Sequence, residues 1–290
     1  MQDRGASGAD PMGWFRARFV PIGHGRAACA QSPALPYGEG VDTRRFFYPV
    51  MQLDADGEVG KLAGTAFPVA PNAGLLTCRH VVDQVDAAGK DIQPVVWDRV
   101  AGQGWPIQRA FFPKDARLDL AFLPNALPGE RAEFLPFLEP NEILTGMRVF
   151  SCGYFAAAGW PHNLRRIGWL SGEIVAVERE HPDVGPRESL LLPYAVIEGV
   201  SGAPVIARDR DGAKVVGVNV GNESQRTLAY EVIESREGEA HHQETAHRVV
   251  EFGLAYHAAP VLDFLNELAD EGHLLAPSVS SAAAATPNLE

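Results

Sequence analysis

Cysteine is scarce in this sequence, with only three residues, Cys29, Cys78 and Cys152, in a chain of 290. Three widely spaced cysteines argue against a disulfide framework and against a metal site built on a Cys-x-x-Cys pair. Residues 1–11 also lack the apolar stretch of a secretory signal peptide. An odd number of cysteines without such a signal favours a reducing compartment. We therefore expect a cytoplasmic protein.

Positive charge and long hydrophobic runs are scarce as well. The chain has 25 Lys and Arg against 37 Asp and Glu, which gives a net charge of −12. Proteins that bind duplex nucleic acid need Lys and Arg to contact phosphates, so this balance argues against a nucleic-acid partner. No run approaches the roughly 18 uncharged apolar residues of a transmembrane helix. With 46% hydrophobic and 21% charged residues, we expect a soluble globular protein that does not enter a membrane.

Helical periodicity is nearly absent. From residue 46 onward, short runs rich in β-branched and aromatic residues alternate with turn residues. The predicted strands are 46–53, 61–69, 94–97, 107–112, 118–123, 148–152, 166–178, 190–196, 204–207, 213–220 and 252–256. The only predicted helix is 260–269, where apolar residues follow a helical spacing. This pattern predicts an all-β barrel or sandwich and argues against an alternating βα fold.

A serine between glycines is the first candidate for chemistry. The motif Gly199-Val200-Ser201-Gly202-Ala203-Pro204 connects two apolar runs that we predict as strands. Glycines let the backbone turn sharply, so the serine hydroxyl is unobstructed and successive N–H groups can converge on one oxyanion. The alternative is a hairpin connection with an incidental serine. The motif is not the nucleophile elbow of α/β-hydrolases, because Ala203 replaces the second glycine and a strand follows.

A histidine and an aspartate are the other two candidates. His80 follows the apolar run Leu75-Leu76-Thr77, where we expect a strand to end in an exposed polar turn. A histidine there can act as a general base near neutral pH, or it can be an ordinary surface residue. Asp119 lies in the apolar sequence Leu118-Asp119-Leu120-Ala121. A buried carboxylate needs a partner such as an imidazole, whereas an aspartate at a strand edge can simply face water.

In their order along the chain, these motifs resemble the chymotrypsin-fold serine proteases, especially the bacterial branch that includes the Deg/Htr proteases. The matching segments are Gly64-Thr65-Ala66-Phe67, Leu76-Thr77-Cys78-Arg79-His80, Asp119-Leu120-Ala121, Gly199-Val200-Ser201-Gly202-Ala203-Pro204, Val215-Val216-Gly217-Val218-Asn219 and Gly253-Leu254-Ala255-Tyr256. The resemblance covers roughly residues 46–270. It implies two antiparallel six-stranded barrels and a C-terminal helix, with the active site between the barrels.

The resemblance also implies a serine endopeptidase that works through an acyl-enzyme. Ser201 would attack the peptide carbonyl, His80 would take its proton, and Asp119 would orient His80. The N–H groups of Gly199 and Ser201 would form the oxyanion hole. No metal or organic cofactor is implied. The partners would be a protein or peptide substrate and a regulatory protein that restrains the enzyme.

The same resemblance points to substrate-binding residues and to two departures from the family pattern. Ala195 stands at the pocket base, where trypsin-type enzymes carry Asp, so we expect small or medium apolar side chains before the cleaved bond. Val220, Gly221 and Asn222 would pair with the substrate backbone as a strand edge. Val200 replaces the aspartate that pairs with a new N-terminus in zymogens. Val220 also replaces a Ser or Thr that supports the catalytic aspartate, a loss of order ~1 kcal/mol.

We divide the chain into an N-terminal arm (1–45), a protease domain (46–270, with the barrel boundary near 130–145) and a flexible tail (271–290). The polar segment 222–248 is expected to be an inserted loop, with residues 228–233 as a candidate strand. It would either gate the active site or form a solvated acidic loop.

Other functions compete with this interpretation. The strongest is a protease-fold domain that binds peptides without cleaving them, because Val200 and Val220 depart from the family. A metal site at His241, His242 and His247 is disfavoured, since the residues lack a paired His-x-x-x-His spacing. A papain-like role for Cys152 is disfavoured because no histidine motif lies near it. An esterase of unrelated fold is disfavoured because strands and helices do not alternate.

Overall fold

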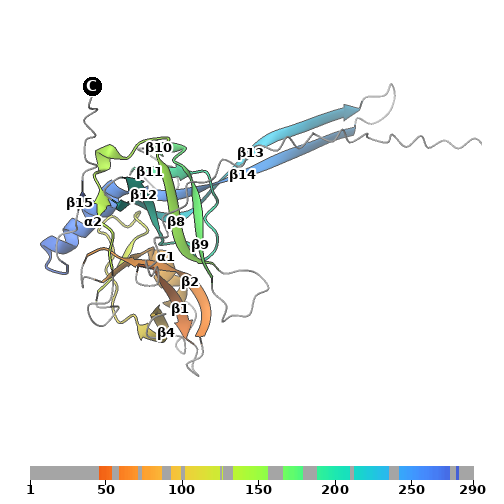
Figure 1. Ribbon diagram of the computed structural model, residues 1–290. Coiled ribbons are helices and arrows are strands. Elements are labelled where there is room, and N and C mark those ends of the chain that lie inside the picture. The colour runs from red at the N-terminus through yellow and green to blue at the C-terminus, as the bar shows by residue number, and fades with distance from the viewer. Residues whose placement is uncertain are drawn as a thin grey trace, which may run out of the picture. The chain divides into compact units, whose positions relative to one another are not determined.

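The computed structural model describes residues 46–53, 59–70, 74–86, 93–98, 102–124, 126, 133–155, 166–178, 188–209, 212–234, 242–274 and 279–280. The chain divides into two units, Met1–Val41 and Asp42–Glu290, and all described residues belong to the second. The N-terminal arm expected at residues 1–45 lies outside the described residues. Within the second unit, strands dominate (Figure 1), which confirms the all-β expectation.

The first barrel is a six-stranded antiparallel sheet with the order β5-β4-β1-β2-β3-β6. Its strands are β1 (Tyr48–Leu53), β2 (Val59–Pro68), β3 (Leu75–Thr77), β4 (Gln93–Asp98), β5 (Gln103–Pro106) and β6 (Ala121–Leu123). The chain beyond β5 closes this sheet, because Phe111 and Phe122 exchange two backbone hydrogen bonds of 2.8 and 2.9 Å. The predicted strand at 107–112 is therefore wrong in extent: among these residues only Phe111 forms a β-bridge, while β5 precedes them.

The second barrel follows the order β10-β11-β14-β13-β12-β8-β9. Its strands are β8 (Arg148–Phe155), β9 (Arg166–Glu173), β10 (Ala176–Glu178), β11 (Ser189–Leu192), β12 (Pro204–Asp209), β13 (Gly212–Glu234) and β14 (His242–His257). Two residues join β9 directly to β10: Ile174 N–H donates to Met147 of the β8 side, and Val175 N–H donates to Leu191 of β11. β10 and β9, the first and last strands of this order, are therefore two halves of one bent strand. This confirms the expected pair of six-stranded barrels.

Two short strands lie beside the second barrel. β7 (Phe137–Leu138) pairs in parallel with Val215 of β13 and also with β15 (Val279–Ser280). A short 3₁₀ helix, η2 (Pro140–Glu142), follows β7. Residues 279–280 fall in the segment expected to be a flexible tail, and their pairing joins that part of the tail to the sheet.

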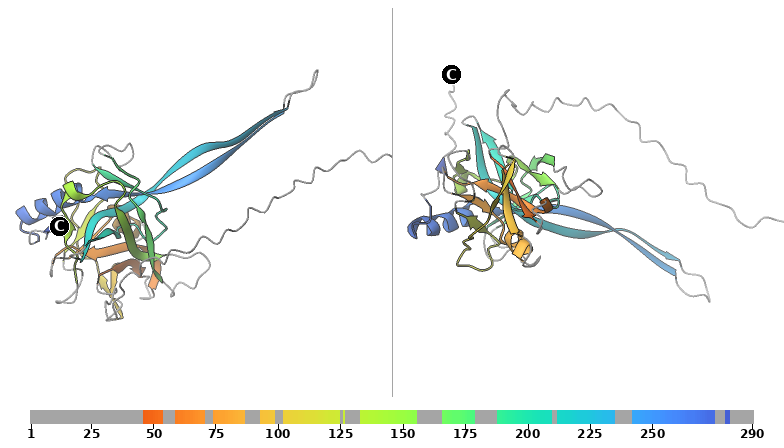
Figure 2. Two further views of the ribbon diagram at one scale, coloured as in Figure 1. Left: turned by 45° about the horizontal axis from the view of Figure 1, so that its top comes forward. Right: turned by 90° about the horizontal axis from the view of Figure 1, so that it is seen from below.

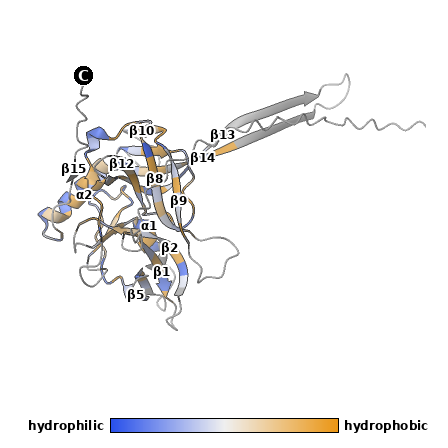
Figure 3. Cartoon of the chain, in the orientation of Figure 1, coloured by the Kyte–Doolittle hydropathy of each residue, from blue (hydrophilic) through white to orange (hydrophobic). Residues whose placement is uncertain are grey.

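Helix α2 (Ala258–Asp270) confirms the predicted C-terminal helix. Its buried residues include Val261, Phe264, Leu265 and Leu268, which recur at the spacing of one helical face and pack into the common hydrophobic core. Hydrophobic and hydrophilic residues alternate along this helix (Figure 3). Helix α1 (Arg79–Asp86) was not predicted, because its eight residues are too few for a clear apolar repeat. No helix among the described residues is long and apolar enough to cross a membrane.

The expected loop at 222–248 is wrong for most of its length, because β13 and β14 continue through it as an antiparallel hairpin. The pairing runs from Gly217↔His257 to Glu234↔His242, with register shifts between Asn219 and Gly221 and between Leu228 and Tyr230. Beyond the barrel the two strands extend away from it as a two-stranded ribbon (Figures 1 and 2). We call residues 221–234 and 242–252 the hairpin arm. The prediction failed because a ribbon outside the core does not need the alternating apolar residues that identify a half-buried strand.

Candidate active site

His80 is held by two hydrogen bonds to one carboxylate. β3 ends at Thr77, and α1 starts at Arg79, so His80 is the second residue of a helix and does not lie in the expected polar turn. Its backbone N–H donates to Asp119 Oδ1 at 2.8 Å, and its Nδ1 forms a short hydrogen bond with Asp119 Oδ2. The Nδ1 contact directs Nε2 away from Asp119. This arrangement lets His80 exchange a proton at Nε2 while Asp119 stabilises the imidazolium form.

Asp119 is held in turn by a tyrosine that the sequence reasoning missed. The Asp119 N–H donates to the hydroxyl of Tyr256 at 2.8 Å, and that hydroxyl donates to the carbonyl oxygen of Arg117 at 3.2 Å. Tyr256 lies on β14 and is 1% exposed. Burial raises the pKa of Tyr256, so its hydroxyl keeps the proton that it donates. From the sequence it was assigned only to the predicted strand 252–256 and to the family-like segment Gly253-Leu254-Ala255-Tyr256.

Ser201 lies in a tight turn formed by two glycines with left-handed backbone conformations. Gly199 has φ +95° and Gly202 has φ +82°, which side-chain-bearing residues rarely adopt. The turn is closed by the Val200 N–H, which donates to Ile197 O at 2.9 Å. In the described part of the chain, the N–H groups of Gly199 and Ser201 have no hydrogen-bond partner. Each of them can therefore donate a hydrogen bond to an oxyanion.

Thr65 joins this turn to the first barrel. Its N–H donates to Ser201 O at 2.9 Å, and its hydroxyl donates to Gly199 O at 2.7 Å. The same hydroxyl accepts a hydrogen bond from Tyr154 N at 3.0 Å. Thr65 is fully buried on β2, so these bonds are protected from water. The Gly-Thr-x-Phe motif contained this residue, although its role was not predicted.

Apolar packing supports the turn from the other side. Val200 is fully buried and packs with Val196 and Ala203, beside the partly buried Phe155 and Leu170. Gly202 N–H donates to Asn219 O at 2.9 Å, which fixes the turn against β13. The position that carries an aspartate in zymogens is thus filled by a hydrophobic side chain. The turn adopts its conformation without an ion pair at this residue.

The Ser201 hydroxyl points toward β13. Its Oγ donates to the carbonyl oxygen of Val220 at 3.4 Å and makes no hydrogen bond with His80, whose ring is also described. The serine turn nevertheless lies against α1. A Cβ added to Gly64 would lie 2.8 Å from both Ser201 O and Val81 Cγ1, and Val81 directly follows His80. The structure therefore brings the turn and the His80 helix together, with the hydroxyl rotated to Val220.

Cys78 lies behind the His80–Asp119 pair. One ligand atom from each of Cys78, His80 and Asp119 falls within 4.8 Å of the others, a spacing that a metal site would allow. The Cys78 thiol, however, donates to Asn219 O at 3.2 Å. Burial, and then the negative charge of Asp119, raise the pKa of this thiol, so it remains protonated and is a poor metal ligand. The residues do not fit a metal site.

The predicted substrate residues lie on two segments that Asn222 connects. Its amide accepts from the N–H of Val196 and donates to Val196 O at 2.9 Å. Val196 follows Ala195, the predicted pocket base, and Asn222 lies two residues beyond Val220. Asn222 thus holds the segment containing Ala195 against the strand that contains Val220 and Gly221. This contact was not predicted.

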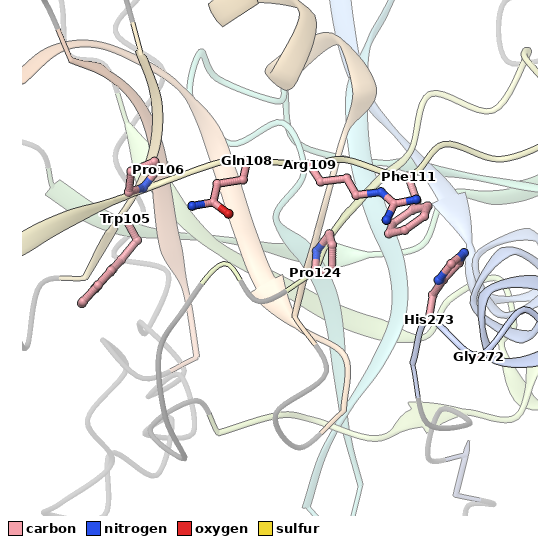
Figure 4. Close-up of a pocket in the computed structure, with 8 residues that line it drawn as sticks. All are labelled: Trp105, Pro106, Gln108, Arg109, Phe111, Pro124, Gly272 and His273. Carbon is pink, nitrogen blue, oxygen red and sulfur yellow. The ribbon is translucent and has the colours of Figure 1, made fainter.

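A separate cavity of about 400 Å³ lies between the first barrel and the end of α2. Figure 4 shows Arg109 and His273 near the Phe111 ring. The Arg109 guanidinium carbon lies 4.2 Å from the ring centroid, and the His273 ring stacks on Phe111 at 4.1 Å. His80, Asp119 and Ser201 do not line this cavity, so it does not belong to the candidate active site.

Comparison with known proteins supplies the family. Residues 64–218 match the model of the trypsin-like peptidase domain. This match covers more than half of the chain, and the chain therefore belongs to the trypsin-like peptidase family, with a chymotrypsin-like fold. The match begins at Gly64, before the His80 motif, and ends at Val218, beyond the Ser201 turn. The comparison with curated protein sequences gave no match.

Solved structures of two complexes of an HtrA-type protease are among the similar ones. The protease AlgW with a tripeptide is 19% identical, with a TM-score of 0.49, and the alignment covers 79% of this chain and 62% of that one. AlgW with a decapeptide is 18% identical, with a TM-score of 0.48, and the alignment covers 78% and 64%. This chain therefore spans less than two thirds of the length of those proteins.

Proposed function

We propose that this protein is a serine endopeptidase with Ser201 as nucleophile, His80 as general base and Asp119 as the residue that orients His80. One observation carries the proposal: a His–Asp pair and a glycine turn with two unpaired N–H groups lie together across the two barrels. A nucleophile, a base with its orienting carboxylate and an oxyanion site are the parts that acyl transfer requires. No cofactor is needed for this chemistry.

The reaction would have two stages. Ser201 Oγ attacks the carbonyl carbon of the substrate while its proton moves to His80 Nε2, and the resulting oxyanion accepts from Gly199 and Ser201 N–H. His80 then gives that proton to the departing amine, the peptide C–N bond breaks, and an ester to Ser201 remains. Water loses a proton to His80 and attacks the ester carbon. The second oxyanion collapses, Ser201 recovers the proton, and the acid product leaves.

The hydrogen bond from Ser201 to Val220 O fits this sequence of events. Val220 belongs to the strand edge proposed to pair with the substrate backbone. A substrate N–H that donates to Val220 O would compete with the Ser201 hydroxyl for this acceptor. Rotation of one serine side chain is fast compared with catalysis, so the freed hydroxyl can turn to His80. Substrate binding would in this way align the nucleophile.

The pocket supports non-tryptic specificity. Ala195 provides no carboxylate for a Lys or Arg side chain at the pocket base. The Asn222 amide occupies space between the two segments that would enclose the substrate side chain. We therefore propose that residues with small or medium apolar side chains precede the cleaved bond.

A second candidate is a peptide-binding domain that does not cleave. The observation that favours it is the rotated Ser201 hydroxyl, which bonds to Val220 O at 3.4 Å and not to His80. Val220 also offers no side-chain hydrogen bond to Asp119, in contrast to the Ser or Thr expected there. Under this alternative the strand edge would bind peptides in the same place.

A fluorophosphonate probe separates the two candidates, because it reacts only with an activated serine. We expect the wild type to be labelled on Ser201, as located by mass spectrometry of the labelled peptide. Ser201→Ala should not react, whereas the matched control Ser171→Ala, which changes an exposed serine on β9, should react like the wild type. An unlabelled wild type that still binds peptides would replace the peptidase proposal with the binding domain.

A reducing compartment and a regulatory partner belong to the same proposal. Cys78 and Cys152 are free and buried, and Cys29 lies outside the described residues. A thiol count under denaturing, non-reducing conditions on protein from its native source should give three free thiols for the whole chain. A regulatory protein would be needed to restrain an active peptidase inside a cell.

A further inference from the structure

Strand β13 is longer than the second barrel requires. It pairs with β12 only from Gly212 to Val218, where Pro204↔Val218 is the last pair. On that edge of β13, no described strand pairs with the residues from Gly221 to Glu234, whose only strand partner is β14 on the opposite edge. This edge starts beside the Ser201 turn, because Ser201 Oγ donates to Val220 O at 3.4 Å. A long row of backbone groups therefore leads away from the candidate active site.

The direction of these groups follows from Asn219 and the pairing with β14. Asn219 N–H donates to Ala203 O, so Asn219 and its partner Ala255 direct their polar groups away from each other. On β14, Gly253 lies two residues before Ala255 and faces the same way, so its partner Asn222 faces the edge opposite β14. Because Gly221 to Leu228 keep a regular register with β14, Ser224 and Arg226 direct their N–H and C=O groups to the same edge as Asn222. The register shift between Leu228 and Tyr230 ends this regular edge.

We propose that the edge of β13 from Val220 to Leu228 binds an extended polypeptide substrate as an added antiparallel strand, well beyond the residues next to the cleaved bond. This inference rests on the proposed peptidase function and defines its substrate as a long, unfolded segment. β13 runs away from Ser201, so an antiparallel partner runs toward it. The added strand is therefore the part of the substrate on the N-terminal side of the cleaved bond.

Two further observations favour a polypeptide as the occupant. A two-stranded ribbon is at best marginally stable in water, and a third strand would stabilise the hairpin arm. Natural edges are usually protected from added strands by Pro or by charged side chains, above all Lys. The sequence Gly-Asn-Glu-Ser-Gln-Arg-Thr-Leu at 221–228 contains no Lys or Pro, and its two charges are of opposite sign. The occupant would be collinear with β12, which is itself antiparallel to β13 on this edge.

A series of peptides with one cleavage site tests the proposal. The sequence after the cleaved bond stays constant, and the N-terminal side is extended by two residues at a time with Ala, Thr and Ser. We expect kcat/KM to rise between about two- and tenfold for each added hydrogen-bonded pair and to level off after about eight residues. The shortest peptide reports the basal activity. A flat series with normal cleavage of the shortest peptide would overturn this inference and leave the peptidase proposal intact.

A shortened hairpin arm provides the matched variant. Residues 226–249 are replaced by Asn-Gly, which joins Gln225 to Val250, a pair that faces across β13 and β14. In this variant we expect kcat/KM for the shortest peptide to equal that of the wild type. Extensions beyond about four residues should no longer raise kcat/KM. A length dependence that survives this deletion would overturn the proposal. Failure of every peptide, together with absent fluorophosphonate labelling, would instead contradict the peptidase function.

Two measurements on the intact chain complete the test. N-methyl groups placed singly along the N-terminal side of the longest peptide should lower kcat/KM at every second residue, because only alternate N–H groups face β13. Equal effects at all positions would contradict strand pairing. Sedimentation of the full chain should show the same oligomeric state with and without the shortened arm. An oligomer that dissociates on shortening would assign the edge to a second copy of the chain.

Discussion

Replacing Tyr256 with Phe tests how the candidate site is held together. The substitution removes one hydroxyl and keeps the buried ring, so the apolar packing of β14 should be preserved. The hydroxyl accepts from Asp119 N at 2.8 Å and donates to Arg117 O at 3.2 Å. Both backbone groups would lose their partner. Asp119 would then be positioned by its two contacts with His80 and by the Arg79 N–H, which donates to Asp119 O at 3.3 Å.

The structure allows an estimate of the cost. A neutral hydrogen bond contributes about 0.5–1.5 kcal/mol, and a buried group left unpaired costs about 1–3 kcal/mol. With two bonds lost near a partly exposed aspartate, we expect a loss of about 2 kcal/mol in the free energy of unfolding. This corresponds to a decrease in Tm of about 4–8 °C for a domain of this size. If misalignment of the His80–Asp119 pair raises the activation free energy by about 1 kcal/mol, kcat falls about fivefold.

The assay combines thermal unfolding with kinetics on a cleaved peptide. Tyr154→Phe is the matched control, because the buried Tyr154 hydroxyl donates to Phe47 O at 3.1 Å. The control should lose stability with kcat unchanged, whereas Tyr256→Phe should lower kcat and leave KM unchanged. If Tyr256→Phe lost stability as the control does, with kcat within twofold of the wild type, the positioning role assigned to Tyr256 would be refuted.

Three further substitutions address the serine turn and the start of α2. Gly199→Ala would place a Cβ 2.5 Å from Tyr154 O at φ +95°, so we expect kcat to fall about 100-fold or more, with circular dichroism checking that the fold persists. Thr65→Val removes the hydroxyl that bonds to Gly199 O and should cost about 2 kcal/mol in denaturant unfolding; Thr65→Ser should restore it. Burial lowers the pKa of His257, the N-cap of α2. The unfolded protein therefore binds more protons at this histidine than the folded protein does, and the free energy of unfolding falls as pH drops below about 6.5. His257→Asn should keep the cap and flatten the unfolding free energy between pH 7 and 5; an unchanged slope would contradict this account.

The residues proposed for catalysis could be named from the sequence because their motifs are local. His80, Asp119 and Ser201 each stand in a short, recognisable context, and the glycines around Ser201 require backbone conformations that the structure shows. The C-terminal helix was predictable for a similar reason, since its apolar residues recur within one segment. The strand at 107–112 was misplaced because β propensity does not state where the neighbouring strand will pair.

The residues that support the site were not predictable in the same way. Thr65 and Tyr256 act on backbone groups that lie 134 and 137 residues away along the chain. A buried threonine or tyrosine in a strand looks like any core residue until its partner is known. Asn222 is similar, because its amide bonds only to the backbone of Val196.

The cysteine count shows what the sequence alone determined about this protein. Three scattered cysteines argued against a disulfide framework, the residue pattern predicted an all-β fold, and the family resemblance carried by the motifs implied two barrels. Tertiary structure alone decided that the Ser201 hydroxyl bonds to Val220 O and that residues 222–248 mostly continue two strands. The physical reason is that side-chain rotation and strand pairing depend on the neighbours that folding brings together. Those neighbours are distant in the sequence.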